Sequence, residues 1–382
     1  MRLTGSFPRL LVILSAGLTL ATCAAGASLA GTATGAITQA TSHATAGAQA
    51  EARQLPRYGN PAGHATVPPA ARAVSTAKPA TVIGSGTPAG CTSKKVVRAV
   101  AKGGVITFNC GPNPVTITMT ATAKVVNTHR RTVIDGGGKV TLSGGGKVRI
   151  LYMNTCDPKQ IYTTSDCWQQ KWPQLVVQNL TFTGAYSGVR ETKTSDYGGG
   201  AIFAEGGQLK VVNSGFFSNR CYRSGPDLGG AAIRALGMYA HRPVYITDDT
   251  FRGGRCSNGG ALSSIDASWD VLNTVMTRNK TTGRGENPAA HGTPGGGSGG
   301  AIYTDGDNYN VTINGSLIRF NTAGGGEGGA VFFVVDSGSG KLTIEYSTLH
   351  HNPSGGYVNL PGIFDEVDGT VTTPTVIHST IN

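Results

Sequence analysis

Four charged residues lie close to the same point of a repeated four-residue phrase, and their types could support two reactions on a polysaccharide. They are Glu205, Arg234, Asp266 and Asp305. An arginine can remove the proton beside a uronate carboxylate while neighbouring carboxylates hold Ca²⁺, which is the chemistry of a polysaccharide lyase. Two carboxylates across a glycosidic bond, here Asp266 and Asp305, can instead hydrolyse it. These four are the candidate catalytic residues, and Ca²⁺ is expected as a cofactor only for a lyase.

The phrase that positions these residues is Gly-Gly-Ala followed by an aliphatic residue. Its first glycines are Gly199, Gly229, Gly259, Gly299 and Gly328, at intervals of 30, 30, 40 and 29 residues. A fixed phrase at such intervals is typical of a repeat array, in which each unit buries its apolar face by stacking on the next. The sequence therefore predicts one stacked domain, with bounds 89–382.

Each repeat contains three short segments with the alternation of a β-strand. The phrase begins one segment, a second run such as 209–213 follows, and the third has the form Phe-x-x-Asn, as at 216–219. Glycine and asparagine between the segments tolerate the left-handed backbone conformation of sharp corners. The second runs end in asparagine or aspartate residues, which we expect to stack on one another as a ladder: Asn179, Asn213, Asp248 and Asn273. We predict an all-β, single-stranded right-handed parallel β-helix. A short helix at 93–101, with Val96, Val97 and Val100 on one face, is expected to cap its N-terminal end.

The Gly-Gly-Ala-aliphatic and Phe-x-x-Asn units resemble polymorphic membrane protein repeats, and residues 91–382 are more broadly similar to the pectate-lyase-like superfamily of secreted β-helix proteins. The resemblance implies a substrate groove along the strands that begin at the phrase. The loops before these strands vary most and are expected to flank the groove: 220–228, 252–258, 281–298 and 322–327. The paired-aspartate and Gly-His-Gly pattern of polygalacturonases and the Arg-x-Pro-x-x-Arg pattern of pectate lyases are absent from this sequence.

Strand alternation predicts which side chains would face this groove. If Ile202, Ala232 and Leu262 point into the core together with Ile302 and Val331, the residues that follow them point outward: Phe203, Ile233, Ser263, Tyr303 and Phe332. The aromatic rings could stack on sugars, and packing beneath the loops is the alternative. The candidate substrate-binding residues are Phe203, Tyr303, Phe332, Asp307 and His291.

The N-terminal region is expected to direct export. Residues 1–27 have the form of a signal peptide, because Arg2 and Arg9 precede an apolar stretch at 10–20 and small residues follow it at 25–27. Residues 28–88 are rich in Ala, Thr and Pro without periodicity, which predicts a disordered linker. No apolar run is long enough to span a membrane. We expect a secreted protein, extracellular or associated with the cell surface, with lipid attachment at Cys23 as an alternative.

Six cysteines follow the predicted signal peptide, and an even number predicts disulfide bonds in an exported protein. Proximity along the chain favours three pairs: Cys91–Cys110, Cys156–Cys167 and Cys221–Cys256. Metal binding is the alternative, but no Cys-x-x-Cys spacing supports it.

The formal charge of +11 favours an acidic partner. We expect an acidic polysaccharide, and no nucleic-acid-binding motif appears. The predicted function is cleavage of an acidic glycan by a monomeric secreted lyase or glycoside hydrolase. The alternative is a non-catalytic, adhesin-like protein that binds glycans at the cell surface, since fold alone does not decide activity.

Overall fold

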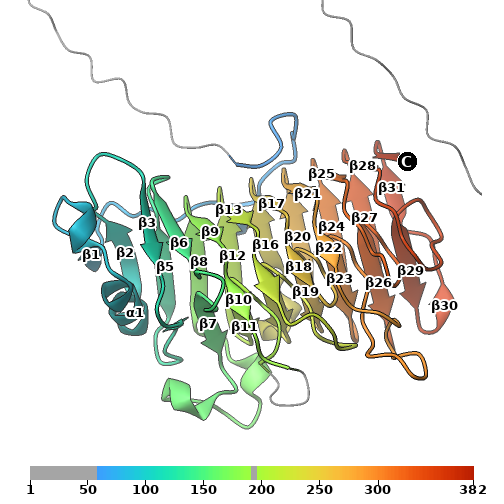
Figure 1. The fold of residues 1–382 in the computed structure, drawn as a ribbon, viewed down its shortest axis with the longest axis horizontal. Helices are drawn as coiled ribbons and strands as arrows, with labels where there is room; N and C mark the ends of the chain where they lie inside the picture. The colour runs from blue at the N-terminus through green and yellow to red at the C-terminus, as the bar shows by residue number, and fades with distance from the viewer. Residues whose placement is uncertain (1–57, 191–195) are drawn as a thin grey trace, which may run out of the picture. The chain divides into compact units, whose positions relative to one another are not determined.

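The computed structural model describes residues 58–190 and 196–382, which form four stacked sheets of short strands (Figure 1). Successive strands of the chain enter different sheets, and strands one repeat apart pair in parallel. The protein is therefore mostly β with long parallel sheets, an arrangement compatible with the predicted β-helix. The predicted signal peptide and residues 28–57 of the predicted linker lie outside the described residues.

We call the four sheets A, B, C and D. Sheet A contains β1 (Thr81–Ile83), β2 (Gly104–Phe108), β5 (Arg131–Asp135), β8 (Gln174–Gln178), β12 (Gln208–Val212), β16 (Val244–Thr247), β20 (Trp269–Leu272), β24 (Asn310–Asn314), β27 (Lys341–Glu345) and β31 (Thr375–Ile377). Sheet B contains β3 (Val115–Thr118), β6 (Val140–Ser143), β9 (Thr181–Thr183), β13 (Gly215–Phe217), β17 (Thr250–Arg252), β21 (Val275–Thr277), β25 (Leu317–Arg319), β28 (Thr348–His350) and β32 (Thr380–Ile381). These two sheets correspond to the second and third segments predicted in each repeat.

Sheet C is built by the strands that follow the Gly-Gly-Ala phrase and by their neighbours. It contains β4 (Ala123–Lys124), β7 (Leu151–Asn154), β11 (Ile202–Glu205), β15 (Ile233–Leu236), β19 (Leu262–Ile265), β23 (Ile302–Asp305), β26 (Val331–Val335), β29 (Ile363–Val367) and β30 (Thr370–Val371), of which only β29 and β30 pair antiparallel. Sheet D consists of two-residue strands between sheets B and C, and the sequence did not predict it: β10 (Tyr186–Ser187), β14 (Arg220–Cys221), β18 (Arg255–Cys256) and β22 (Lys280–Thr281).

One α-helix occurs among the described residues, and it is the predicted one. Helix α1 (Ser93–Lys102) lies at the N-terminal end of the sheets (Figure 1). It buries Val96, Ala99 and Val100 and packs against β1 and β4. Gly103 ends the helix with a φ of 69°, a conformation that suits glycine. The remaining helical segments are single 3₁₀ turns: η1 (Pro69–Ala71), η2 (Pro88–Gly90), η3 (Pro158–Gln160), η4 (Cys167–Gln169) and η5 (Tyr239–His241).

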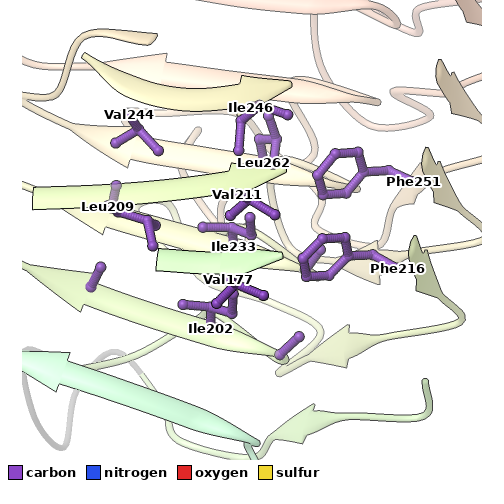
Figure 2. Packing of buried hydrophobic residues seen from close by; sticks show 14 of the residues in the cluster. Val177, Ile202, Leu209, Val211, Phe216, Ile233, Val244, Ile246, Phe251 and Leu262 are labelled. Carbon is purple, nitrogen blue, oxygen red and sulfur yellow. The ribbon is translucent and has the colours of Figure 1, made fainter. Parts of the chain in front are cut away.

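The apolar core lies between the sheets and repeats the same side chains at matching positions (Figure 2). Ile202, Ile233 and Leu262 are aligned on adjacent strands of sheet C and are fully buried. On sheet B the rings of Phe216 and Phe251 stack with centroids 4.7 Å apart. Each repeat therefore buries its apolar residues against its neighbours, as the period of the sequence predicts.

The asparagines of the Phe-x-x-Asn segments form a buried ladder after sheet B. The Asn321 side-chain oxygen accepts hydrogen bonds from the backbone and side-chain nitrogens of Asn279, at 3.0 and 2.9 Å, and Asn352 accepts the same pair from Asn321. The ladder was expected at the other corner, where Asn213 and Asn273 have φ values of 45° and 49°. That corner also has hydrogen bonds between successive repeats, from Asn213 Nδ2 to Asn179 Oδ1 at 2.8 Å and from Asn179 Nδ2 to Asp135 Oδ1 at 3.0 Å, so the expected ladder is present over these repeats. Asn213 and Asn273 in addition accept hydrogen bonds from backbone nitrogens of the N-terminal segment.

The N-terminal segment 58–80 was predicted to belong to a disordered linker, but it lies in order across several repeats. The Tyr58 nitrogen donates to the Asn213 side chain at 3.1 Å, and Val74 exchanges two hydrogen bonds with Gln178. Strand β1 then pairs with β2. The ordered chain thus begins well before residue 89, because side chains of the stacked repeats satisfy the backbone of a segment with no apolar periodicity of its own.

All three predicted disulfides are present. Cys91–Cys110, Cys156–Cys167 and Cys221–Cys256 have Cα–Cα distances of 5.7, 5.0 and 4.8 Å. The last one joins β14 to β18, so it links two successive repeats. Among residues 58–190 and 196–382, no helix has the length and apolar character needed to cross a membrane.

Candidate functional site

The outer face of sheet C presents one aligned column of side chains. Phe203, Arg234, Ser263, Tyr303 and Phe332 occupy matching positions on β11, β15, β19, β23 and β26. Ile233 was expected here and Arg234 was not. The second phrase contains an extra small residue, Gly-Gly-Ala-Ala, which shifts its strand by one position and exchanges inward and outward side chains.

A pocket of about 740 Å³ lies over this face at its C-terminal half. Three of the four loops predicted to flank a groove contribute to it, through Asp227, Glu286, Asn287 and Glu327. Among the described residues, its lining contains no basic side chain and six carboxylates: Asp227, Glu286, Asp305, Glu327, Asp336 and Glu366. The pocket is therefore acidic although the whole chain is basic.

Aromatic rings stack at one side of the pocket. The centroids of Tyr303 and Phe332 are 4.8 Å apart, and those of Phe332 and Phe364 are 5.3 Å apart. Tyr303 is 0% exposed and Phe332 is 2% exposed, so the rings support the pocket and offer little area for stacking on a sugar. The packing alternative considered for these aromatic residues fits this arrangement best.

Asp305 is held at the pocket by a hydrogen-bond network. The Tyr303 hydroxyl donates to Asp305 Oδ2 at 2.7 Å, and Asn287 Nδ2 donates to the same oxygen at 2.7 Å. Burial raises the pKa of Asp305 to about 6, and the charges of Asp336 and Asp227 add to the rise, while the hydrogen bond from Tyr303 opposes it. Asp305 can therefore exchange a proton near neutral pH.

Glu327 is the second carboxyl group in the pocket with a strongly displaced pKa. Burial, together with the neighbouring carboxylates of Glu286 and Glu366, raises its pKa to about 7. Like charges and low polarity both favour the protonated form of a carboxylic acid. At neutral pH this residue carries a proton in about half of the molecules, so it can act as an acid.

The structure does not bring the four predicted catalytic residues together. Arg234 is 0% exposed. Its strand, β15, is separated from β23 by β19, so Arg234 lies about 10 Å along the sheet from Tyr303. Its Nη1 donates to the Ser263 hydroxyl at 2.6 Å, and its Nε and Nη2 have no hydrogen-bond partner among the described residues. In this position Arg234 cannot reach a substrate in the pocket.

Glu205 lies farther along the same face and is also buried. Its carboxylate accepts hydrogen bonds from Asn154 at 2.7 Å and from the Trp168 indole at 2.9 Å, and burial raises its pKa. Phe203 stacks on Tyr152 in the same region, with centroids 5.5 Å apart. Neither Glu205 nor Phe203 lines the acidic pocket.

The described lining of the pocket does not include Asp266, Asp307 or His291. Asp266 accepts a hydrogen bond from the Asp307 backbone at 2.6 Å, and burial raises its pKa. Asp307 is exposed and binds Ser337, with its Oδ1 accepting from the Ser337 hydroxyl at 2.9 Å. His291 is exposed in the longest loop. Of the four predicted catalytic residues, only Asp305 lines the pocket.

Sequence reasoning missed the role of Glu327, Asn287 and Glu366. Glu327 and Asn287 fall within loops that the sequence had marked as variable, but loop residues have no periodicity from which to infer their direction. Glu366 lies in β29, a strand whose repeat lacks the Gly-Gly-Ala phrase. It pairs in register with Val334 and so reaches the pocket.

No family model matches the chain, and no curated protein and no solved structure shows a significant match to it. Among residues 58–190 and 196–382, no group of three or more His, Cys, Asp and Glu side chains is arranged to hold a metal ion.

Proposed function

We propose that this protein is a secreted glycoside hydrolase whose catalytic pocket lies on the outer face of sheet C. We infer that its repeats wind as a right-handed parallel β-helix, because a connection between parallel strands of one sheet is almost always right-handed. The three disulfides support an oxidising compartment and hence export.

The observation that carries the proposal is the pair of carboxyl groups with raised pKa values in one pocket. In the proposed reaction Glu327 gives its proton to the glycosidic oxygen as the bond to the leaving sugar breaks. Water supplies a hydroxyl group to the anomeric carbon, and its proton passes to ionised Asp305. With pKa values of about 7 and about 6, both groups have the required protonation states at the same pH.

The lining favours a hydrolase over the lyase that the sequence also predicted. A lyase that neutralises the uronate carboxylate with basic side chains would need them in the pocket, whose described lining has six carboxylates and no basic side chain. Arg234, the expected base, is buried two strands away from Tyr303. We therefore expect the sugar at the point of cleavage to be neutral, in place of the acidic glycan expected from net charge.

A second candidate is sugar binding without cleavage. One observation favours it: Asp305 is 7% exposed and accepts hydrogen bonds from both Tyr303 and Asn287, which limits its access to a water molecule. Movement of the loop that carries Asn287 would be needed to open the site, as occurs in many enzymes.

The test is release of reducing ends from a panel of neutral and acidic glycans. Glu327→Gln and Asp305→Asn should each lower the rate by about 100-fold or more, since a general acid or base contributes that much. Asp368→Asn, an exposed carboxylate in the β29–β30 turn, is the control and should leave the rate unchanged. Ultraviolet absorbance of an unsaturated product would identify a lyase instead, and retention of glycans without any cleavage would identify the binding protein.

A further inference from the structure

The outer faces of sheets B and D form a surface that is rich in cations. Arg220, Arg255 and Lys280 are paired in register on β14, β18 and β22, and all three are exposed. Adjacent strands lie about 4.8 Å apart, so the three charges form a straight row. This row is separate from the acidic pocket described above, since none of its residues lines that pocket.

Further arginines extend the row on both sides. We call the set the cationic face, and all of its members are exposed: Arg220, Arg223, Arg252, Arg255, Arg278, Lys280, Arg284 and Arg319. The strands of sheets B and D and the short turns between them contain no Asp or Glu. The ion pair between Arg149 and Asp196 in the described part of the chain involves none of these cations.

A groove of about 560 Å³ runs beside the row. Its lining includes Tyr186, Arg220, Tyr222 and Arg255, and Tyr186 is in register with Arg220. The guanidinium of Arg190 lies 5.0 Å from the centre of the Tyr222 ring. The groove thus combines cations with two partly buried tyrosines, a combination that can bind both the charges and the rings of a sugar polymer.

The energetics of the row point to an anionic ligand. Like charges at facing positions of neighbouring strands destabilise a sheet, and no carboxylate of sheets B and D relieves them. Arginine binds carboxylate and sulfate groups through two parallel hydrogen bonds. A polymer with one anionic group per sugar could neutralise successive repeats in turn, which a small anion could not.

We propose that the cationic face binds a linear anionic polysaccharide bearing carboxylate or sulfate groups. A polysaccharide is favoured over a nucleic acid because three disulfides indicate an oxidising compartment. Two loops that follow strands of sheet D connect the cationic face to the acidic pocket. The loop after β14 contains Arg223 of the cationic face and Asp227 of the pocket, and the loop after β22 contains Arg284 and Glu286 in the same way. The polymer is thus held beside a pocket that repels it, and its binding does not depend on the proposed hydrolysis.

The experiment measures equilibrium binding of the purified protein to dextran sulfate, polygalacturonate, uncharged dextran and double-stranded DNA. The test variant is Arg220→Gln/Arg255→Gln/Lys280→Gln. The matched control is Lys94→Gln/Arg98→Gln/Lys102→Gln, which removes the same charge from exposed positions of α1. Thermal unfolding verifies that both variants are folded, and release of reducing ends from a short neutral glycan measures the acidic pocket separately.

We expect the unaltered protein to bind both anionic polysaccharides, to ignore dextran, and to lose affinity as salt is added. The sheet D variant should bind about tenfold more weakly or worse, and the α1 variant should bind within about twofold of the unaltered protein. An equal loss of affinity in both variants would show that binding depends only on net charge, and would overturn the proposal. Tighter binding of DNA than of either polysaccharide would overturn the ligand class.

Discussion

Replacement of Glu327 by glutamine should stabilise the protein at alkaline pH. In the folded state burial and the charges of Glu286 and Glu366 raise the pKa of Glu327 from 4.5 to about 7. The folded state therefore holds this proton more tightly than the unfolded state does. The resulting stabilisation is complete below pH 4.5 and is lost as the pH rises through about 7, where the folded protein must carry an unfavourable charge.

The size of the effect follows from the difference between the two pKa values. At about 1.4 kcal/mol per pKa unit, a rise from 4.5 to about 7 corresponds to an upper limit of about 3.4 kcal/mol. Glu327 is only half-buried, and solvent screening reduces this to about 1–2 kcal/mol. Glutamine has nearly the same shape and no charge, so Glu327→Gln should be more stable than the unaltered protein by this amount at pH 8 and equal to it at pH 4.

The assay is urea unfolding of the unaltered protein, Glu327→Gln and Asp368→Asn at pH 4, 6 and 8. Asp368→Asn should change the free energy of unfolding by less than about 0.5 kcal/mol at each pH, because Asp368 is exposed in a turn. The reasoning fails if Glu327→Gln is less stable at pH 8, or if its offset is the same at every pH. Combined with loss of hydrolysis, the expected result would identify Glu327 as a residue that lowers stability in exchange for activity.

Three further predictions concern the fold and the assignment of the site. Asn321→Ala should lower the free energy of unfolding by about 2–4 kcal/mol, because it removes the acceptor of the buried Asn279 backbone nitrogen and one of the two donors to Asn352, whereas exposed Asn310→Ala should cost less than about 0.5 kcal/mol; equal effects would contradict the ladder. Cys221→Ser/Cys256→Ser should lower it by about 2–5 kcal/mol, since the disulfide closes a span of 35 residues, and an unchanged melting temperature would argue against the bond. Arg234→Met should leave hydrolysis unchanged and keep or raise stability by about 1 kcal/mol, because two guanidinium nitrogens lack partners among the described residues; loss of turnover would restore Arg234 as a catalytic residue.

Short-range patterns account for the parts of the fold that were predicted. The Gly-Gly-Ala phrase and the Phe-x-x-Asn segments predicted the strands of sheets C and B, because period and turn residues are local properties of a repeat. The three disulfides followed from proximity in the chain. The two-residue strands of sheet D were missed, since such short strands have no alternation to detect. The order of residues 58–80 was missed as well, because Asn213 and Gln178 stabilise it from distant repeats.

The candidate site shows the same limit. Asp305 was predicted because its position in a strand relates it to the phrase, and it lines the pocket. Glu327 and Asn287 come from loops, and only packing decides where a loop side chain points. Arg234 shows how sensitive strand arguments are: one added residue in its phrase moved it into the outward column of Phe203 and Tyr303, where Ile233 was expected.

The sequence by itself determined that this chain is a stacked repeat with paired cysteines and a net positive charge, because spacing and composition require no knowledge of contacts. Only the tertiary structure decided how that charge is distributed. Stacking places Arg220, Arg255 and Lys280 in one row. It also gathers carboxylates over sheet C from three loops, from strands β23 and β29, and from the turn after β26. Burial and repulsion within that pocket then displace the pKa values of Asp305 and Glu327, and these effects depend on neighbours that lie far apart in the chain.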